Sequence, residues 1–421
     1  MFANFKQIFK PANKDLRKKI YFTFLCLFVF KLGTTIVVPG IDKNSLGTNS
    51  LGFLELMNLM GGGALEQFSI FALGVTPYIT ASIVMQLLQA TELIPYLTDL
   101  ANQGGTGRNK LNKITRYVGI AFAFIQGYMF SFAFVNNGTP SDYIQFALIL
   151  TAGTSLLLWI GDQITQKGVG NGISLIIMAG IIANLPSMFM TAWDTFVVGS
   201  TTQAIALGVT KFTLFTLLYI AIIVGVVYVE SAERRIPIQY TNKTVSGSKQ
   251  SYVPFKLNSS GVMPVIFASA LMSIPSIFST FIKNEGFQLF VNKYLTTSTT
   301  TGFIIYIVSI FLFSYFYAFY TIKPKEMAEN VNKNGGFIPG IIPGEETVNY
   351  VSAILKRITT VGAAALAFIA ALPIIFGAVT NLPSSMRIGG TGLIIVVGVA
   401  LETYKAVDSE LKARKFARGR K

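Results

Sequence analysis

The 421-residue chain contains no histidine, a single cysteine and few charged residues. Without histidine, a histidine-based metal centre or acid–base catalyst is excluded, and Cys26 alone cannot support a disulfide framework. Only 13% of the residues are charged, against about a quarter in soluble domains, whereas 52% are hydrophobic. The composition therefore predicts a protein that is built for lipid rather than for water.

The sequence also lacks a catalytic constellation. Adjacent carboxylates occur at Glu345 and Glu346, with no histidine, cysteine or metal-ligand spacing near them. The GGTG run at 389–392 lacks the lysine of a phosphate-binding loop and instead opens an apolar stretch. We therefore expect no enzyme, no cofactor and no metal site, and an ATP-driven step would need a motor from another chain.

Apolar runs of about 20 residues, the length that crosses a bilayer as an α-helix, recur along the chain. They predict an all-α polytopic membrane protein with ten transmembrane helices. The predicted spans are 20–38, 74–91, 114–135, 143–162, 172–190, 212–231, 261–282, 303–322, 358–378 and 390–404.

The positions of Lys and Arg predict the orientation. With the N-terminus inside, 28 of the 34 basic residues fall in cytoplasmic segments, five fall outside, and Lys31 lies within the first span. Cytoplasmic loops of membrane proteins carry such an excess, so both termini are expected in the cytoplasm. The net charge of +15 fits this bias and attraction to anionic lipid better than binding to DNA.

The spans divide the chain into two halves with basic ends. The predicted parts are a basic N-terminus (1–19), a first half (20–190), an outer linker (191–211), a second half (212–404) and a basic tail (405–421). Two cytoplasmic loops, 232–260 and 323–357, are long, basic and hydrophilic. They are either solvated connectors or a docking surface for a large partner with an acidic or RNA surface.

The segment between the first two spans, 39–73, is apolar, interrupted by three glycines at 61–63, and too short to cross the membrane. Such a segment is tolerated at membrane depth only where protein or a water-filled cavity surrounds it. Its position therefore indicates a specialised structural element rather than a lipid-exposed loop.

A stripe of branched side chains follows in the second span, where Val75, Ile79 and Ile83 share one helical face. The stripe is either a surface for lipid or core packing, or part of an apolar constriction that resists ion leakage. Ionisable residues are scarce in the spans: Lys31, Asp162, Glu230 and Glu402 lie in or near span ends, where snorkelling or capping is expected. This scarcity argues against an ion-coupled transporter.

Five stretches resemble signature blocks of the bacterial SecY family, whose members are channel subunits of the general protein translocase. The blocks are GGGALEQFSIFALGVTPYITASIVMQLL (61–88), WIGDQITQKGVGNGISLIIMAGIIANLP (159–186), PFKLNSSGVMPVIFASALMSIP (254–275), KPKEMAENVNKNGGFIPGIIPGEETVNYV (323–351) and GGTGLIIVVG (389–398). They occur in the family's order and span nearly the whole chain. The resemblance implies two five-helix halves with inverted pseudo-symmetry around a pore in the bacterial plasma membrane, opening sideways to lipid at a lateral gate.

The resemblance also implies three groups of site residues. The pore ring would comprise Val75, Ile79, Ile177, Ile181, Ile266 and Ile395. A plug helix at about 53–65 would include Phe53, Leu56, Leu59, Gly61, Gly62, Gly63 and Leu65. The lateral gate would place Thr80 and Ile83 against Ala270 and Ile274, helped by spans three and eight.

The partners that the resemblance implies are the small membrane subunits SecE and SecG, a SecA-type ATPase or a ribosome, and signal peptides with the translocating polypeptides that carry them. Residues expected at the motor or ribosome docking surface are Arg108, Lys110, Arg234, Arg235, Lys249, Lys256, Lys333, Ile342, Lys356 and Arg357.

The chain departs from the family pattern at four places. Ile342 occupies the position of a loop arginine, GRNK at 107–110 replaces GRRK, Lys31 replaces an arginine, and Thr80 replaces a serine. Isoleucine cannot mimic the planar donor fork of arginine, so coupling to the usual motor is in question. The chain is then either a housekeeping SecY of a divergent lineage or an accessory SecY for a restricted set of exported proteins. A small-solute transporter and a non-conducting scaffold or insertase remain as other classes.

Overall fold

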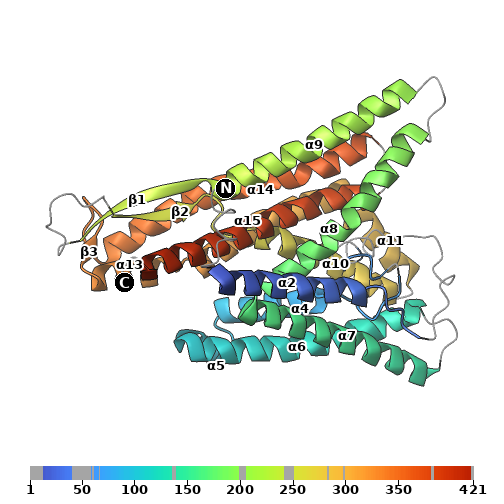
Figure 1. The fold of residues 1–421 in the computed structure, drawn as a ribbon, viewed down its shortest axis with the longest axis horizontal. Helices are drawn as coiled ribbons and strands as arrows, with labels where there is room; N and C mark the ends of the chain where they lie inside the picture. Colours follow the sequence, from blue (N-terminus) through green and yellow to red (C-terminus); the bar gives the residue numbers. More distant parts are fainter. Residues whose placement is uncertain are drawn as a thin grey trace.

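The computed structural model describes residues 13–39, 58, 61–65, 67–134, 139–198, 205–240, 251–281, 284–296, 299–380 and 384–418. Helices dominate these residues, and the long helices run side by side in one elongated bundle (Figure 1). The expected all-α polytopic fold class is confirmed.

Each of the ten predicted spans overlaps one helix. These helices are α2 (Lys14–Gly33), α4 (Thr76–Ala90), α6 (Gly104–Phe134), α7 (Pro140–Lys167), α8 (Gly172–Trp193), α9 (Ile205–Ser231), α10 (Met263–Phe281), α12 (Thr300–Thr321), α14 (Glu345–Val379) and α15 (Ser384–Arg418). In the part of the chain that the structure describes, six helices are long and apolar enough to cross a membrane by themselves. The count of ten spans stays a prediction.

Several helices extend beyond the apolar run that predicted them. Helix α14 begins at Glu345 rather than at residue 358, and α15 continues to Arg418. The expected linker 191–211 is partly helical too, because α8 is followed directly by a π-helix (Asp194–Val198) and α9 begins at Ile205. A hydrophobicity window finds only the part of a helix that lies in hydrocarbon, whereas the backbone hydrogen bonds continue into the polar ends.

Local sequence signals explain where key helices begin. Asn171 accepts hydrogen bonds at its side chain from the backbone N–H groups of Ile173 and Ser174, which caps α8. Thr139 and Asp142 form a capping box at the start of α7. Pro77 lies in the first turn of α4, where its missing N–H costs nothing.

The described residues of the two long basic loops fold together at one end of the bundle (Figure 1). Strands β1 (Glu233–Tyr240) and β2 (Ser251–Lys256) form an antiparallel hairpin, and β3 (Gly336–Phe337) pairs with the other edge of β1. Helix α13 (Pro324–Lys333) lies beside them (Figure 1). Buried side chains from the hairpin, including Ile236 and Ile238, join a hydrophobic cluster with Leu355 of α14. The described parts of the two loops therefore form one folded unit, which the hydrophilic composition did not predict.

The two halves of the chain meet along the middle of the bundle. Helix α8 packs against α15, while α4 and α6 pack against α10. The short helices α5 (Pro95–Asn102) and α11 (Glu285–Tyr294) lie toward opposite ends (Figure 1). The largest hydrophobic cluster is built from residues of both halves at this junction, which is where the candidate site lies.

Candidate functional site

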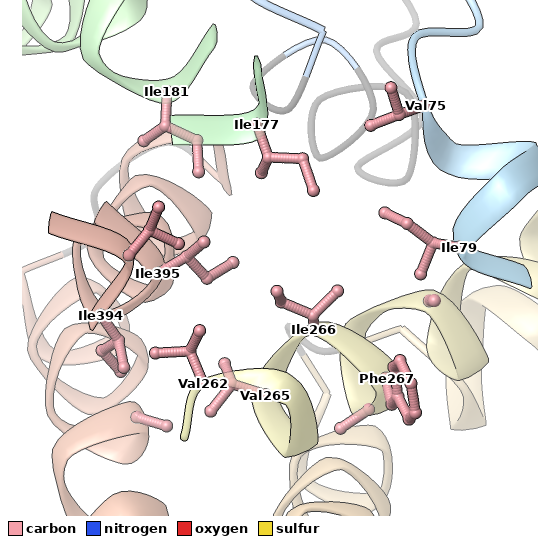
Figure 2. Close-up of a cluster of buried hydrophobic side chains, with 14 of the residues drawn as sticks. Val75, Ile79, Ile177, Ile181, Val262, Val265, Ile266, Phe267, Ile394 and Ile395 are labelled. Carbon is pink, nitrogen blue, oxygen red and sulfur yellow. The ribbon is translucent and has the colours of Figure 1, made fainter. Parts of the chain in front are cut away.

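The six expected ring residues lie together in one buried hydrophobic cluster. They come from α4 and the residue before it, from α8, from α10 and from α15, and none is more than 5% exposed. Figure 2 shows their side chains arranged around a common centre. Ile177 and Ile181 are four residues apart on α8, as Val75 and Ile79 are at the start of α4, so each pair presents one helical face. The ring therefore draws on both halves of the molecule.

A polar cavity of about 460 Å³ reaches one side of these residues. Ile79, Ile177 and Ile266 line its apolar end. Its other walls carry polar side chains, among them Gln86 and Asn112, and an ion pair between Arg116 of α6 and Asp162 of α7. We call this cavity the vestibule. It is a chamber suited to water that ends at a layer of branched hydrocarbon.

A glycine-rich segment lies against the other side. Gly62 and Gly63 have φ of +73° and +83°, a backbone conformation that glycine adopts without strain. A Cβ on Gly62 would lie 3.1 Å from the Cα of Gly180, which sits between Ile177 and Ile181 on α8. On α8 the vestibule is lined by residues up to Ile177, whereas the segment contacts begin at Gly180, so the two lie on opposite sides of the ring.

Among the described residues of the expected plug, 61–65 are buried and Asn58 is partly buried. Gly61, Gly62 and Gly63 are buried, and Leu65 packs in a neighbouring hydrophobic cluster with Val38. Ala64 is fully buried and belongs to the same cluster as the ring. The remaining expected plug residues, Phe53, Leu56 and Leu59, lie outside the described residues.

The expected gate residues lie on helices that contact each other. Helix α4 carries Thr80 and Ile83, and it packs against α10, which carries Ala270 and Ile274. Ile83 and Ala270 are buried in the same cluster as the ring, whereas Thr80 and Ile274 are partly exposed. The Thr80 hydroxyl donates to the Thr76 carbonyl of its own helix at 3.2 Å. Small and apolar side chains let helices approach closely without strong polar bonds between them.

A second cavity, of about 890 Å³, lies between α4, α5, α6 and α12, and we call it the side cavity. It shares Tyr78, Ser82, Gln86 and Asn112 with the vestibule, so the two are adjacent. At its wall, the Tyr320 hydroxyl of α12 donates to the Gln89 side-chain oxygen of α4 at 2.9 Å. The sequence analysis missed this bond between the two halves. The sequence feature that could have indicated it is Gln89, a polar residue near the end of an otherwise apolar span.

The expected docking residues that the structure describes are all exposed, and Lys249 lies outside the described residues. They lie on the hairpin, on α13, at the start of α6 and near the start of α14, toward the same end of the bundle (Figure 1). Arg235 pairs with Glu233 at 2.7 Å and stacks over the Tyr252 ring at 4.7 Å. Ile342 is 72% exposed, in a turn between Gly340 and Gly344.

Three of the four ionisable residues near span ends have protein partners. Asp162 pairs with Arg116, and the Lys31 ammonium donates to the Gly62 carbonyl at 3.1 Å. Glu230 is 7% exposed and accepts a 2.6 Å hydrogen bond from Asn258. Snorkelling toward the membrane surface is therefore not their only role, because each of the three side chains has a polar partner elsewhere in the protein.

Comparison with known proteins gives a consistent result. The SecY family model matches residues 69–404. The chain is 44% identical to "Protein translocase subunit SecY" of Staphylococcus carnosus (strain TM300), over 99% of each chain. Two solved structures share the fold at 18% identity, each covering 95% of this chain and 93% of its own. One, "The structure of a protein conducting channel", has a TM-score of 0.67. The other, on the SecY plug domain and the closed state of the channel, has a TM-score of 0.65. The chain belongs to the SecY family.

Proposed function

We propose that this chain is the protein-conducting channel subunit of a protein translocase. It passes unfolded, signal-bearing polypeptides across the bacterial plasma membrane and releases apolar segments sideways into lipid. The observation that carries the proposal is the ring: six branched side chains from both halves meet between a polar vestibule and a buried glycine-rich segment.

The chemistry of the ring suits a seal that closes around many different chains. Valine and isoleucine offer a moving polypeptide no hydrogen bonds, so no sequence is held in the ring. An apolar constriction also excludes water and therefore resists ion flow. A polar or charged ring would select particular ions instead, and none of the six residues is polar.

The side cavity supports a sideways exit. It adjoins the vestibule and is bounded by α4 and α12, which belong to different halves. If α4 separates from α10 and α12, the vestibule opens toward lipid along this face. A signal peptide or membrane segment is an apolar helix, so it partitions into that opening by the hydrophobicity that would insert it into a bilayer.

The channel has no motor of its own in this scheme. A SecA-type ATPase or a translating ribosome docks on the exposed basic residues of the folded loops, and SecE and SecG complete the membrane complex. Clustered positive charge steers acidic or RNA surfaces toward this end. Both termini are then cytoplasmic, and the glycine-rich segment lies toward the outer side as a plug.

A restricted role as an accessory SecY is the second candidate. Ile342 is exposed in the turn where the family carries an arginine, so a motor that relies on arginine would lose its bidentate partner. A dedicated motor with an apolar contact at this position would be consistent with that change.

Transport into vesicles tests the main proposal. Purified chain is reconstituted with SecE and SecG, and a signal-bearing precursor, SecA and ATP are added. We expect the precursor to become protected from protease, and the same precursor without its signal to remain sensitive. Absence of protection with every cognate motor would overturn the proposal. Uptake of small solutes driven by an ion gradient would favour the transporter class instead.

A further inference from the structure

We propose that Lys31 and Asn184 form a two-point latch that holds Asn58 and the segment 61–65 against the ring. The strength of this latch sets how readily the segment leaves. The inference rests on the proposed function, because it gives this segment the role of a plug.

The first point of the latch comes from α2. The ammonium of Lys31, in the last turn of that helix, donates to the backbone carbonyl of Gly62 at 3.1 Å. A bond with a charged donor is stronger than a neutral one. Lys31 is itself exposed, so water or lipid headgroups can solvate the ammonium once the carbonyl moves away. The bond therefore stabilises the position of Gly62, and breaking it leaves no buried charge without solvation.

The second point comes from α8. The side-chain amide of Asn184 donates to the backbone carbonyl of Asn58 at 3.2 Å. The same carbonyl accepts the Gly63 N–H at 2.9 Å, so the oxygen uses both lone pairs. Asn184 lies one helical turn beyond Ile181, which places the latch beside the ring itself.

At the glycines the latch acts on a segment that is held through its backbone, where the Gly63 carbonyl also accepts the Gln67 N–H at 3.2 Å. Residues 61–63 have no side chains to pack, and Gly62 approaches the backbone of Gly180 directly. Ala64 places only a methyl group in the ring cluster. Because both latch bonds end on backbone carbonyls, they hold the path of the chain rather than a particular side chain.

The position of the two donors links the latch to helix movement. Lys31 follows Phe30, whose ring stacks on Phe71 with centroids 6.3 Å apart, and Phe30 also lies close to Gly62. A shift of α2 relative to α8 would therefore pull the two donors apart and release the segment. The latch thereby links a relative movement of α2 and α8 to release of the segment.

The test measures release of the segment without any precursor or motor. Ala64→Cys is placed in a Cys26→Ser background, and a membrane-impermeant maleimide is added to proteoliposomes from the outer side. Ala64 is fully buried, so its labelling rate reports how often the segment moves. Lys31→Met and Asn184→Ala each remove one latch bond, and Lys31→Arg keeps a charged donor.

We expect Asn184→Ala to label about five-fold faster and Lys31→Met to label at least as much faster. The double variant should label faster still, and Lys31→Arg should approach the parent rate. Lys211→Met and Thr191→Ala are matched controls, since both residues are exposed, on α9 and on α8 respectively, outside the segment. Each variant is checked for parental thermal stability first. Either latch point alone tests the inference if the other variant does not fold.

Unchanged labelling in the single and double variants would overturn the latch, as would an equal increase in the two controls. The labelling result is separate from the transport result. Faster labelling in a protein that protects no precursor would keep the latch and reject the channel function. Precursor protection with unchanged labelling would reject the latch alone.

Discussion

The hydrogen bond between Tyr320 and Gln89 ties α12 to α4 across the two halves of the chain, and its removal should favour gate opening. The bond is 2.9 Å long, and both side chains are partly buried at the wall of the side cavity. Tyr320→Phe removes the hydroxyl donor and keeps the aromatic ring of the side chain. Because the cavity is roomy and partly polar, water can take the place of the lost hydroxyl at Gln89, so no buried acceptor is left without a partner.

The expected size follows from the energy of one neutral hydrogen bond. Its net contribution is about 1 kcal/mol, which changes the ratio of open to closed channels about five-fold. If the open state is a minor population, the transport rate of a precursor with a weakened signal should rise by the same factor. A precursor with an intact signal should respond less, because its binding already favours the open state.

A matched control lies on the same helix. The Tyr315 hydroxyl is hydrogen-bonded to Thr360 of α14, a contact within one half, so Tyr315→Phe should leave the weakened precursor unaffected. Gln89→Leu should mimic Tyr320→Phe, and the double variant should add nothing further. Equal stimulation by Tyr315→Phe, or full additivity of the Gln89 and Tyr320 changes, would refute the reasoning.

Three further outcomes are expected. Ile79→Gly with Ile181→Gly should raise ion conductance of the resting channel, measured in planar bilayers, because smaller side chains widen the apolar constriction; an unchanged conductance would count against the ring. Ile342→Arg should increase transport driven by a generic SecA, measured as precursor protection, and an indifferent result would remove the argument for an accessory role. Asn258→Ala should lower the thermal midpoint, measured by dye fluorescence on heating. The change removes the 2.6 Å bond to buried Glu230, worth about 1.5–3 kcal/mol, together with the side-chain bonds of Asn258 to Gly261 and Ser260. A midpoint equal to that of the parent would show that this group of bonds contributes little.

The sequence was most informative where the determining property is local. Membrane insertion depends on the apolarity of about 20 consecutive residues, so each predicted span corresponds to a helix in the structure. The charge of the two long loops, 232–260 and 323–357, can likewise be read from the sequence alone. The strands and the helix α13 that these loops form lie toward one end of the bundle (Figure 1). The family resemblance predicted the ring residues. Residue spacing alone did not decide whether Val75 and Ile79 belong to a packing surface or to an apolar constriction.

The fold of the two long loops could not be predicted from the local sequence. The hydrophilic composition of 232–260 suggested a connector or a docking loop, yet Ile236 and Ile238 alternate with exposed residues along β1 and pack on α14. The alternation was present in the sequence, but its apolar partners lie more than a hundred residues away in α14. A short strand of this kind is stable only when its buried face has a partner.

The sequence by itself therefore determined the environment of this protein: a predominantly helical chain whose recurring apolar segments are suited to lipid. Only the tertiary structure decided that residues of both halves converge on one ring, with a polar vestibule on one side and a glycine-rich segment on the other. It also revealed the contacts that would hold the closed state, such as Tyr320 with Gln89, 231 residues apart. The physical reason is that hydrophobicity acts on each segment separately, whereas closing a channel depends on contacts between segments that the chain order does not specify.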